Sequence, residues 1–150
     1  MMAAAAIVVL AGCAPQAAPA TTAPAPAPTT AAPTAAAVVV PAYVPWGTAV
    51  VNRAFFDIVN NQTVTAAGGS PEGPAFITAL RTAGFPADVM EVTQDITTVG
   101  VKADSIQFSV KMSDACLVGQ WGAVVGYVSI AAPILSTGKC LVGETRTIDF

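Results

Sequence analysis

The stretch that decides the fold is Ser105-Ile106-Gln107-Phe108-Ser109-Val110-Lys111-Met112, in which polar and apolar residues alternate. Successive side chains of a β-strand point to opposite faces of a sheet. This alternation therefore predicts a strand with one buried side and one solvent-facing side. The buried side holds Ile106, Phe108, Val110 and Met112, and the solvent-facing side holds Ser105, Gln107, Ser109 and Lys111.

Further strands are predicted on both sides of this one. After the turn at Met112-Ser113-Asp114-Ala115, short apolar runs separated by glycine and serine indicate strands at Cys116–Trp121, Gly126–Ala132 and Cys140–Val142. Before it, two weaker strand candidates lie at Val89–Thr93 and Thr98–Val101.

Upstream of the strands the apolar period becomes helical. A first helix is predicted to end near Asn60-Asn61 or shortly after. Its inward residues are Val50, Val51, Ala54, Phe55, Ile58 and Val59, opposite Asn52, Arg53, Asp57 and Asn60. A second helix is predicted from Glu72 to Ala83, with Gly84 as its stop, and Pro86-Ala87-Asp88 opens a short turn. We therefore expect an α+β fold with two N-terminal helices packed on one face of a small antiparallel sheet of about four strands, preceded by a disordered tether.

All six Lys and Arg and all nine Asp and Glu lie at Arg53 or later, so the first 52 residues carry no charged side chain. The apolar run from Ala3 to Gly12 would be about 15 Å long as a helix, and a bilayer takes roughly twice that. Residues 1–12 are therefore predicted to be a signal peptide. Leu10-Ala11-Gly12-Cys13 resembles the bacterial lipobox, which implies cleavage before Cys13 and lipidation of its thiol.

The apolar run lacks the positively charged segment with which export signals usually begin. Either the true start lies upstream, or export from this start is inefficient. The alternative interpretation is a hydrophobic N-terminal tail with a free cysteine.

Residues 14–37 contain twelve Ala, six Pro and five Thr, a composition that has nothing large to bury. We expect a semi-rigid spacer that reaches at most roughly 75 Å. The expected organisation is a signal peptide at 1–12, a lipidated cysteine and linker at 13–45, and the α+β domain at 46–150. The expected location is extracytoplasmic, with a lipid anchoring the protein to the cell membrane.

With Cys13 assigned to the lipid, Cys116 and Cys140 remain as an even pair. In an exported domain such a pair favours a structural disulfide. Both cysteines begin the sequence Cys-Leu-Val-Gly, so two similar strands lying side by side would bring the thiols together. The alternatives are two buried free thiols and a redox pair, although a redox pair normally has C-x-x-C spacing.

Several kinds of chemistry lack the residues they need. The chain has no histidine, which removes Ser-His catalysis and the commonest metal ligand. Ser109 and Lys111 are better explained as one side of a strand than as a catalytic pair, and Asp88 and Glu91 as solvated or capping carboxylates. The net charge of −3 argues against nucleic-acid binding. We expect no enzymatic activity, no cofactor and no metal.

One unusual surface candidate remains, at the bend between Gly122 and Gly126. Trp121, Val124, Val125 and Tyr127 place apolar side chains where turns are usually polar. These side chains either fold back onto the core or dock a partner.

Three stretches carry a resemblance to a known family: 103–110, Cys116-Leu117-Val118-Gly119-Gln120-Trp121-Gly122 and Cys140-Leu141-Val142-Gly143. They are similar to a small domain of unknown function found in actinobacterial envelope lipoproteins. The likeness covers most of residues 46–150, and it implies an envelope location and paired cysteines.

Two functional classes follow from these features. The favoured one is a membrane-tethered envelope lipoprotein that binds or scaffolds without chemistry of its own. The alternative is a small ligand-binding receptor or an accessory subunit of an envelope enzyme or transporter.

Overall fold

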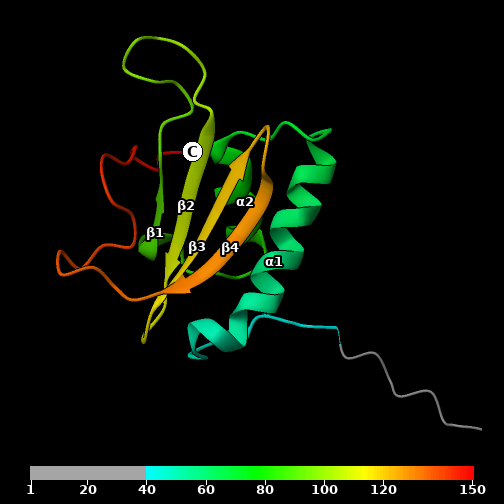
Figure 1. The fold of residues 1–150 in the computed structure, drawn as a ribbon. Coiled ribbons are helices and arrows are strands. Elements are labelled where there is room, and N and C mark those ends of the chain that lie inside the picture. The colour runs from blue at the N-terminus through cyan, green and yellow to red at the C-terminus, as the bar shows by residue number, and fades with distance from the viewer. Residues whose placement is uncertain (1–39) are drawn as a thin grey trace, which may run out of the picture. The chain divides into compact units, whose positions relative to one another are not determined.

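The computed structural model describes residues 40–150. The predicted signal peptide, Cys13 and the linker up to residue 39 lie outside the described residues. The elements are α1 (Ala49–Ala66), α2 (Gly73–Thr82), the 3₁₀ turn η1 (Ala87–Val89), β1 (Met90–Val92), β2 (Ser105–Lys111), β3 (Cys116–Gly122) and β4 (Gly126–Ala132). Figure 1 shows both helices on one side of the sheet, which we call the inner face. The opposite side is the outer face.

The four strands form one antiparallel sheet in the order β1-β2-β3-β4, so each strand pairs with the next one along the chain. Phe108 on β2 lies opposite Val92 on β1 and Gly119 on β3. The α+β architecture with two helices and four strands is therefore confirmed.

Two of the predicted strands are wrong. Cys140–Val142 is irregular chain that crosses the sheet, and Thr98–Val101 belongs to a turn closed by an isolated bridge between Ile96 and Lys102. The first strand of the sheet is instead β1, inside the weaker candidate at Val89–Thr93.

The first helix continues to Ala66 and buries a different face from the predicted one. Its buried residues are Ala49, Asn52, Phe56, Val59, Asn60 and Thr63, whereas Val50 and Val51 are 73% and 56% exposed. Asn52 is buried because its side chain bonds the chain that enters the helix: Oδ1 accepts from Val44 N at 2.8 Å, and Nδ2 donates to Val44 O at 3.1 Å. Hydrogen bonding at Asn52 thus overrides the apolar pattern.

The second helix and its ends agree with the prediction. Glu72 precedes the first helical residue, and Pro74 lies in the first turn. At the other end, Gly84 adopts a φ of +96°, and Phe85 N donates to Leu80 O at 3.1 Å. This bond closes the helix end in the manner of a Schellman motif and turns the buried Phe85 towards the core.

The core lies between the helices and the inner face and is centred on Phe108. Its ring stacks on Phe76 of α2, with centroids 4.2 Å apart, and lies 5.9 Å from the ring of Phe56 of α1. Gly119 makes room for this ring, because a Cβ at Gly119 would lie 2.5 Å from Phe108. The alternation that predicted β2 thus fills the space between the helices and the sheet.

Candidate functional site

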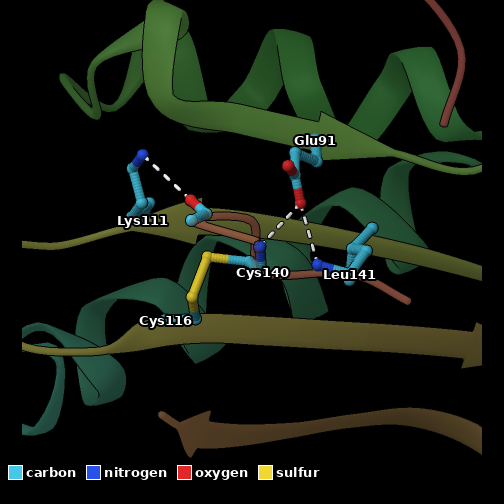
Figure 2. Close-up of a disulfide and its surroundings, with 6 residues drawn as sticks. Glu91, Lys111, Cys116, Cys140 and Leu141 are labelled. Carbon is cyan, nitrogen blue, oxygen red and sulfur yellow. Dashed lines mark hydrogen bonds between the residues drawn. A yellow bond between two sulfur atoms is a disulfide. The ribbon is translucent and has the colours of Figure 1, made fainter. Parts of the chain in front are cut away.

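A segment after β4, residues 138–142, crosses the outer face of the sheet, and we call it the strap. A disulfide joins Cys140 of the strap to Cys116 at the start of β3, with Cα atoms 5.6 Å apart. Figure 2 shows this bond at the centre of the strap's attachment to the sheet. The two cysteines therefore pair as predicted, although one of them lies on a strand and the other on a crossing segment.

Two side chains of the sheet also hold the strap. Glu91 on β1 accepts hydrogen bonds from Cys140 N at 2.9 Å and from Leu141 N at 2.8 Å, both on the same carboxylate oxygen. Lys111 on β2 donates to Gly138 O at 3.2 Å. Figure 2 shows these contacts on both sides of the disulfide. The strap thus spans β1, β2 and β3, fixed by one covalent bond and three hydrogen bonds.

Ser109 corrects the expectation of a solvent-facing side on β2. It lies between Glu91 and Val118 in the pairing register, where the strap crosses, and it is fully buried. Its hydroxyl makes no hydrogen bond to any atom of residues 40–150. The strap therefore buries a polar side chain of the outer face, and leaves it unpartnered within the described domain.

Beyond the strap, the outer face over β3 and β4 is open. A groove of about 410 Å³ lies here, with the strap as one wall and Gln107 and Gln120 at its polar end. Its apolar lining includes Val118, Val128, Ile130, Leu141 and Val142. Val128 and Ile130 are 51% and 56% exposed. Half of the outer face thus presents branched aliphatic side chains to solvent.

The four residues predicted at the bend between β3 and β4 lie in different environments. Val124 is 97% exposed and Val125 is 62% exposed, so the tip of the hairpin points into solvent. Trp121 belongs to the core at 4% exposure. Tyr127 is half-buried on the inner face, so of the four predicted partner-binding residues only the two valines form an exposed tip.

A polar cluster that the sequence analysis missed joins α1 to β4. Asp57 accepts hydrogen bonds from Tyr127 Oη at 2.8 Å and from Ser129 Oγ at 2.5 Å. Arg53 donates to Ser129 O at 2.7 Å, a backbone carbonyl of the edge strand. Asn60 donates to Tyr127 Oη at 3.2 Å. These bonds hold the first helix against the last strand.

Burial raises the pKa of the Tyr127 phenol above its ordinary value, and the hydrogen bond to Asp57 raises it further. The phenol therefore stays protonated and donates to the carboxylate at physiological pH. Asp57 and Tyr127 lie 70 residues apart, so no local spacing pattern could have indicated this cluster.

At the unpaired edge of β1, Arg146 makes a backbone hydrogen bond and an ion pair. Arg146 N donates to Val92 O at 2.9 Å, and the guanidinium lies 3.0 Å from Asp95. Asp95 also accepts from Gly73 N at 2.6 Å, at the first residue of α2. Within residues 40–150, no group of three acidic or cysteine side chains could hold a metal ion, and no helix is long and apolar enough to cross a membrane.

Comparisons with known proteins give one match. A model of a family described as a domain of unknown function, DUF6993, matches residues 61–144, which is more than half of the chain. The matched segment includes the disulfide, the strap and the hairpin tip, and begins within α1. Neither a search of curated proteins nor a search of solved structures found a match. The chain therefore belongs to the DUF6993 family, a family of domains of unknown function.

Proposed function

We propose that this protein is an envelope lipoprotein, anchored to the membrane through Cys13, whose domain is a non-catalytic binding or scaffolding module. The observation that carries the binding role is the open half of the outer face. Val128 and Ile130 are more than half exposed there, in a groove of about 410 Å³. Burying some 200 Å² of apolar surface on a partner would contribute roughly 5 kcal/mol before the costs of association.

The anchor is supported by the order of the sequence elements. An apolar run, the lipobox-like Leu10-Ala11-Gly12-Cys13 and an uncharged Ala/Pro/Thr linker follow one another. A diacylglycerol thioether carries two acyl chains, which anchor stably where a single chain binds only marginally. The domain would then be extracytoplasmic, where disulfides persist.

The anchor is tested with the wild type and Cys13→Ser in an actinobacterial host. We expect the wild type in the membrane fraction with the added mass of a lipid, and Cys13→Ser without that mass. A wild-type chain that is soluble and carries no lipid mass contradicts the anchor.

The binding role is tested by photo-crosslinking in the same host. A crosslinking residue at Ile130 should capture one stoichiometric protein. The same residue at Val99, which is 80% exposed in the loop before β2, should not. Equal products at both positions, or none at Ile130, contradict the binding role of this face.

The hairpin tip is tested separately with Val124→Ser and Val125→Ser together. Because both side chains are exposed, we expect an unchanged melting temperature and weaker capture of the partner. A large loss of stability would mean that the tip packs on the fold instead.

A small-molecule receptor is the second candidate, because the groove volume lies within the range of ligand pockets, roughly 300 to 1,000 Å³. Native mass spectrometry of the gently extracted protein separates the two. A retained small molecule favours the receptor, and a retained protein favours the scaffold.

A further inference from the structure

The N-terminal end of the described domain exposes a second apolar surface. Five large hydrophobic residues within a short length of chain are between 44% and 95% exposed, and we call them the base patch: Val40, Val44, Trp46, Val50 and Val51. No charged residue precedes Arg53, so the patch is also free of charge along the chain. Figure 1 shows this end of α1 opposite the end that carries the β3–β4 turn.

Trp46 is the most exposed of the five, at 95%, and its backbone is strained. It has a φ of +62°, in a turn closed by Gly47 N donating to Val44 O at 3.0 Å. Pro45 and Trp46 are the central residues of this turn, and a positive φ at the second of them is the position that glycine normally fills. The side chain of Asn52 holds the turn by bonding both polar atoms of the Val44 backbone. The fold thus keeps an indole in solvent at a position where stability alone favours glycine.

Beside the indole lies an apolar hollow of about 470 Å³. Its apolar lining is Tyr43, Pro45, Trp46, Pro86, Val89 and Met112. Its charged lining is Asp88 and Lys111, one group of each sign. Asp114 lies beside the patch as well, because its Oδ1 accepts from Ala49 N at 2.9 Å. These groups carry no excess of positive charge, so the surface suits a neutral lipid surface better than an anionic one.

The position of the patch in the sequence indicates that it lies close to the proposed membrane anchor. The chain outside the described residues ends at residue 39, directly before the patch, and in the proposed function it runs from there to a lipidated Cys13. The linker at 14–37 would have an end-to-end distance of roughly 25 to 30 Å as a flexible coil and of at most roughly 75 Å when extended. Such a tether keeps a site near its target at an effective concentration of the order of millimolar. Even weak affinity for the membrane is then enough for contact.

We propose that the base patch docks on the membrane surface, with the Trp46 indole in the interfacial region of a neutral bilayer. Tryptophan favours this region because its ring is apolar and its N–H is polar. The inference rests on the proposed lipid anchor for the local concentration. The domain then lies with the base patch on the membrane and the hairpin tip at the far end.

The test uses the fluorescence of Trp46 in the full-length lipidated protein on phosphatidylcholine vesicles. The other tryptophan, Trp121, is 4% exposed, so the difference between wild type and Trp46→Gly isolates the Trp46 signal. We expect a blue-shifted Trp46 emission that brominated phosphatidylcholine quenches. A protein that floats with the vesicles while Trp46 stays unshifted and unquenched overturns the docking and leaves the anchor intact.

The unlipidated Cys13→Ser chain separates the two proposals in the other direction. In this chain, brominated phosphatidylcholine should quench the fluorescence of Trp46 only when the lipid concentration reaches the millimolar range, because the patch alone binds weakly. This result supports the docking even if the wild type proves to carry no lipid. No quenching at millimolar lipid overturns it.

Two variants and one control locate the contact. Val50→Ser with Val51→Ser should reduce the quenching of Trp46 several-fold, whereas Val124→Ser at the far end should leave it unchanged. Equal effects of both overturn the assignment to the base patch. Trp46→Gly should not lower the melting temperature, since glycine suits the turn; a lower value would assign the indole to the fold.

Two further outcomes would assign a different binding partner to the base patch. Binding confined to anionic phosphatidylglycerol vesicles and lost at high salt would mean attraction by charge, which contradicts a neutral surface. A Trp46 emission that is blue-shifted without lipid, in step with dimerisation, would assign the patch to a second copy of the chain.

Discussion

The inner face of the sheet is packed against α1 and α2, whereas the outer face is covered by the strap over β1, β2 and the start of β3 and left open over the rest of β3 and over β4. On the inner face, Phe108 touches rings from both helices, and the centre of the packing is apolar; the polar contacts of Asp57 lie at its margin, over β4. On the outer face, a disulfide and three hydrogen bonds hold a segment that has no regular structure. We therefore expect most of the stability to come from the inner face. The shape of the outer face depends on the few contacts that hold the strap.

The largest effect is expected from Phe108→Ala on the inner face. Removing the ring leaves a cavity between the sheet and both helices, and such changes cost about 3 to 5 kcal/mol. The free energy of unfolding, measured with denaturant, checks this. Ile130→Ala on the open outer face is the control and should cost far less, because that side chain is more than half exposed. Similar losses for the two variants would contradict the contrast between the faces.

The next largest effect is expected from Cys116→Ala with Cys140→Ala. The disulfide closes a loop with a sequence separation of 24, which is worth on the order of 3 kcal/mol in the chain-entropy model. We also expect faster hydrogen exchange at the amides of Cys140 and Leu141, with little change in the middle of β3. An unchanged denaturation midpoint would show that the hydrogen bonds hold the strap without the covalent bond.

Glu91→Gln should have a smaller effect on the same strap. The amide oxygen can still accept, but the two bonds to Cys140 N and Leu141 N lose the contribution of the charge. The expected loss is about 1 to 2 kcal/mol by denaturant unfolding, since bonds to charged groups are worth roughly 1.5 to 3 kcal/mol each and are only weakened here. Glu144→Gln, at an exposed glutamate after the strap, is the matched control and should be nearly neutral. A loss as small as that of Glu144→Gln would mean that Glu91 does not hold the strap.

The smallest effect is expected from Ser109→Ala, beneath the strap. The substitution removes a buried hydroxyl without a partner in the described domain, so stability should stay the same or rise by up to about 1 kcal/mol. Thermal and denaturant unfolding both measure it. A loss above about 1 kcal/mol would show that a bound water satisfies the hydroxyl in solution.

The sequence predicted the parts of the fold that depend on local pattern. The alternation at Ile106, Phe108 and Val110 identified β2 and the side of it that is buried. Glycine at Gly84 marked the end of α2, where the positive φ is needed. These features succeed because one strand or one helix end determines them.

Predictions failed where a distant segment decides the environment. Val50 and Val51 match a helical stripe, yet α1 packs on the sheet through Phe56, whose ring lies 5.9 Å from that of Phe108 on β2, and both valines face solvent. Cys140–Val142 repeats the first residues of β3, but Glu91 and the disulfide hold it across the strands. Ser109 lies on the predicted side of its strand, but it is buried rather than exposed, because the strap that covers it begins 29 residues later in the sequence.

At the site, the cysteine pair followed from counting. The apolar turn at Val124 and Val125 drew attention to the tip, but the sequence left open whether these side chains pack on the core or face solvent, and the structure exposes both. The contact between Asp57 and Tyr127 could not be foreseen, since it joins α1, the first element in the sequence, to β4, the last. Trp121 carried the same apolar signal as the tip, but its place on the inner face sends it into the core.

The sequential order of the strands has a consequence for how the chain acquires its structure. Each strand pairs with its neighbour in the sequence, so β2, β3 and β4 can form as a meander without closing a long loop. Such local pairing favours fast folding. Cys116, at the start of the central strand β3, is then in place before Cys140, which lies after β4 in the sequence, has to reach it. Oxidation then closes the loop between Cys116 and Cys140 on a sheet whose strand order is already set, so the disulfide stabilises the topology rather than selecting it.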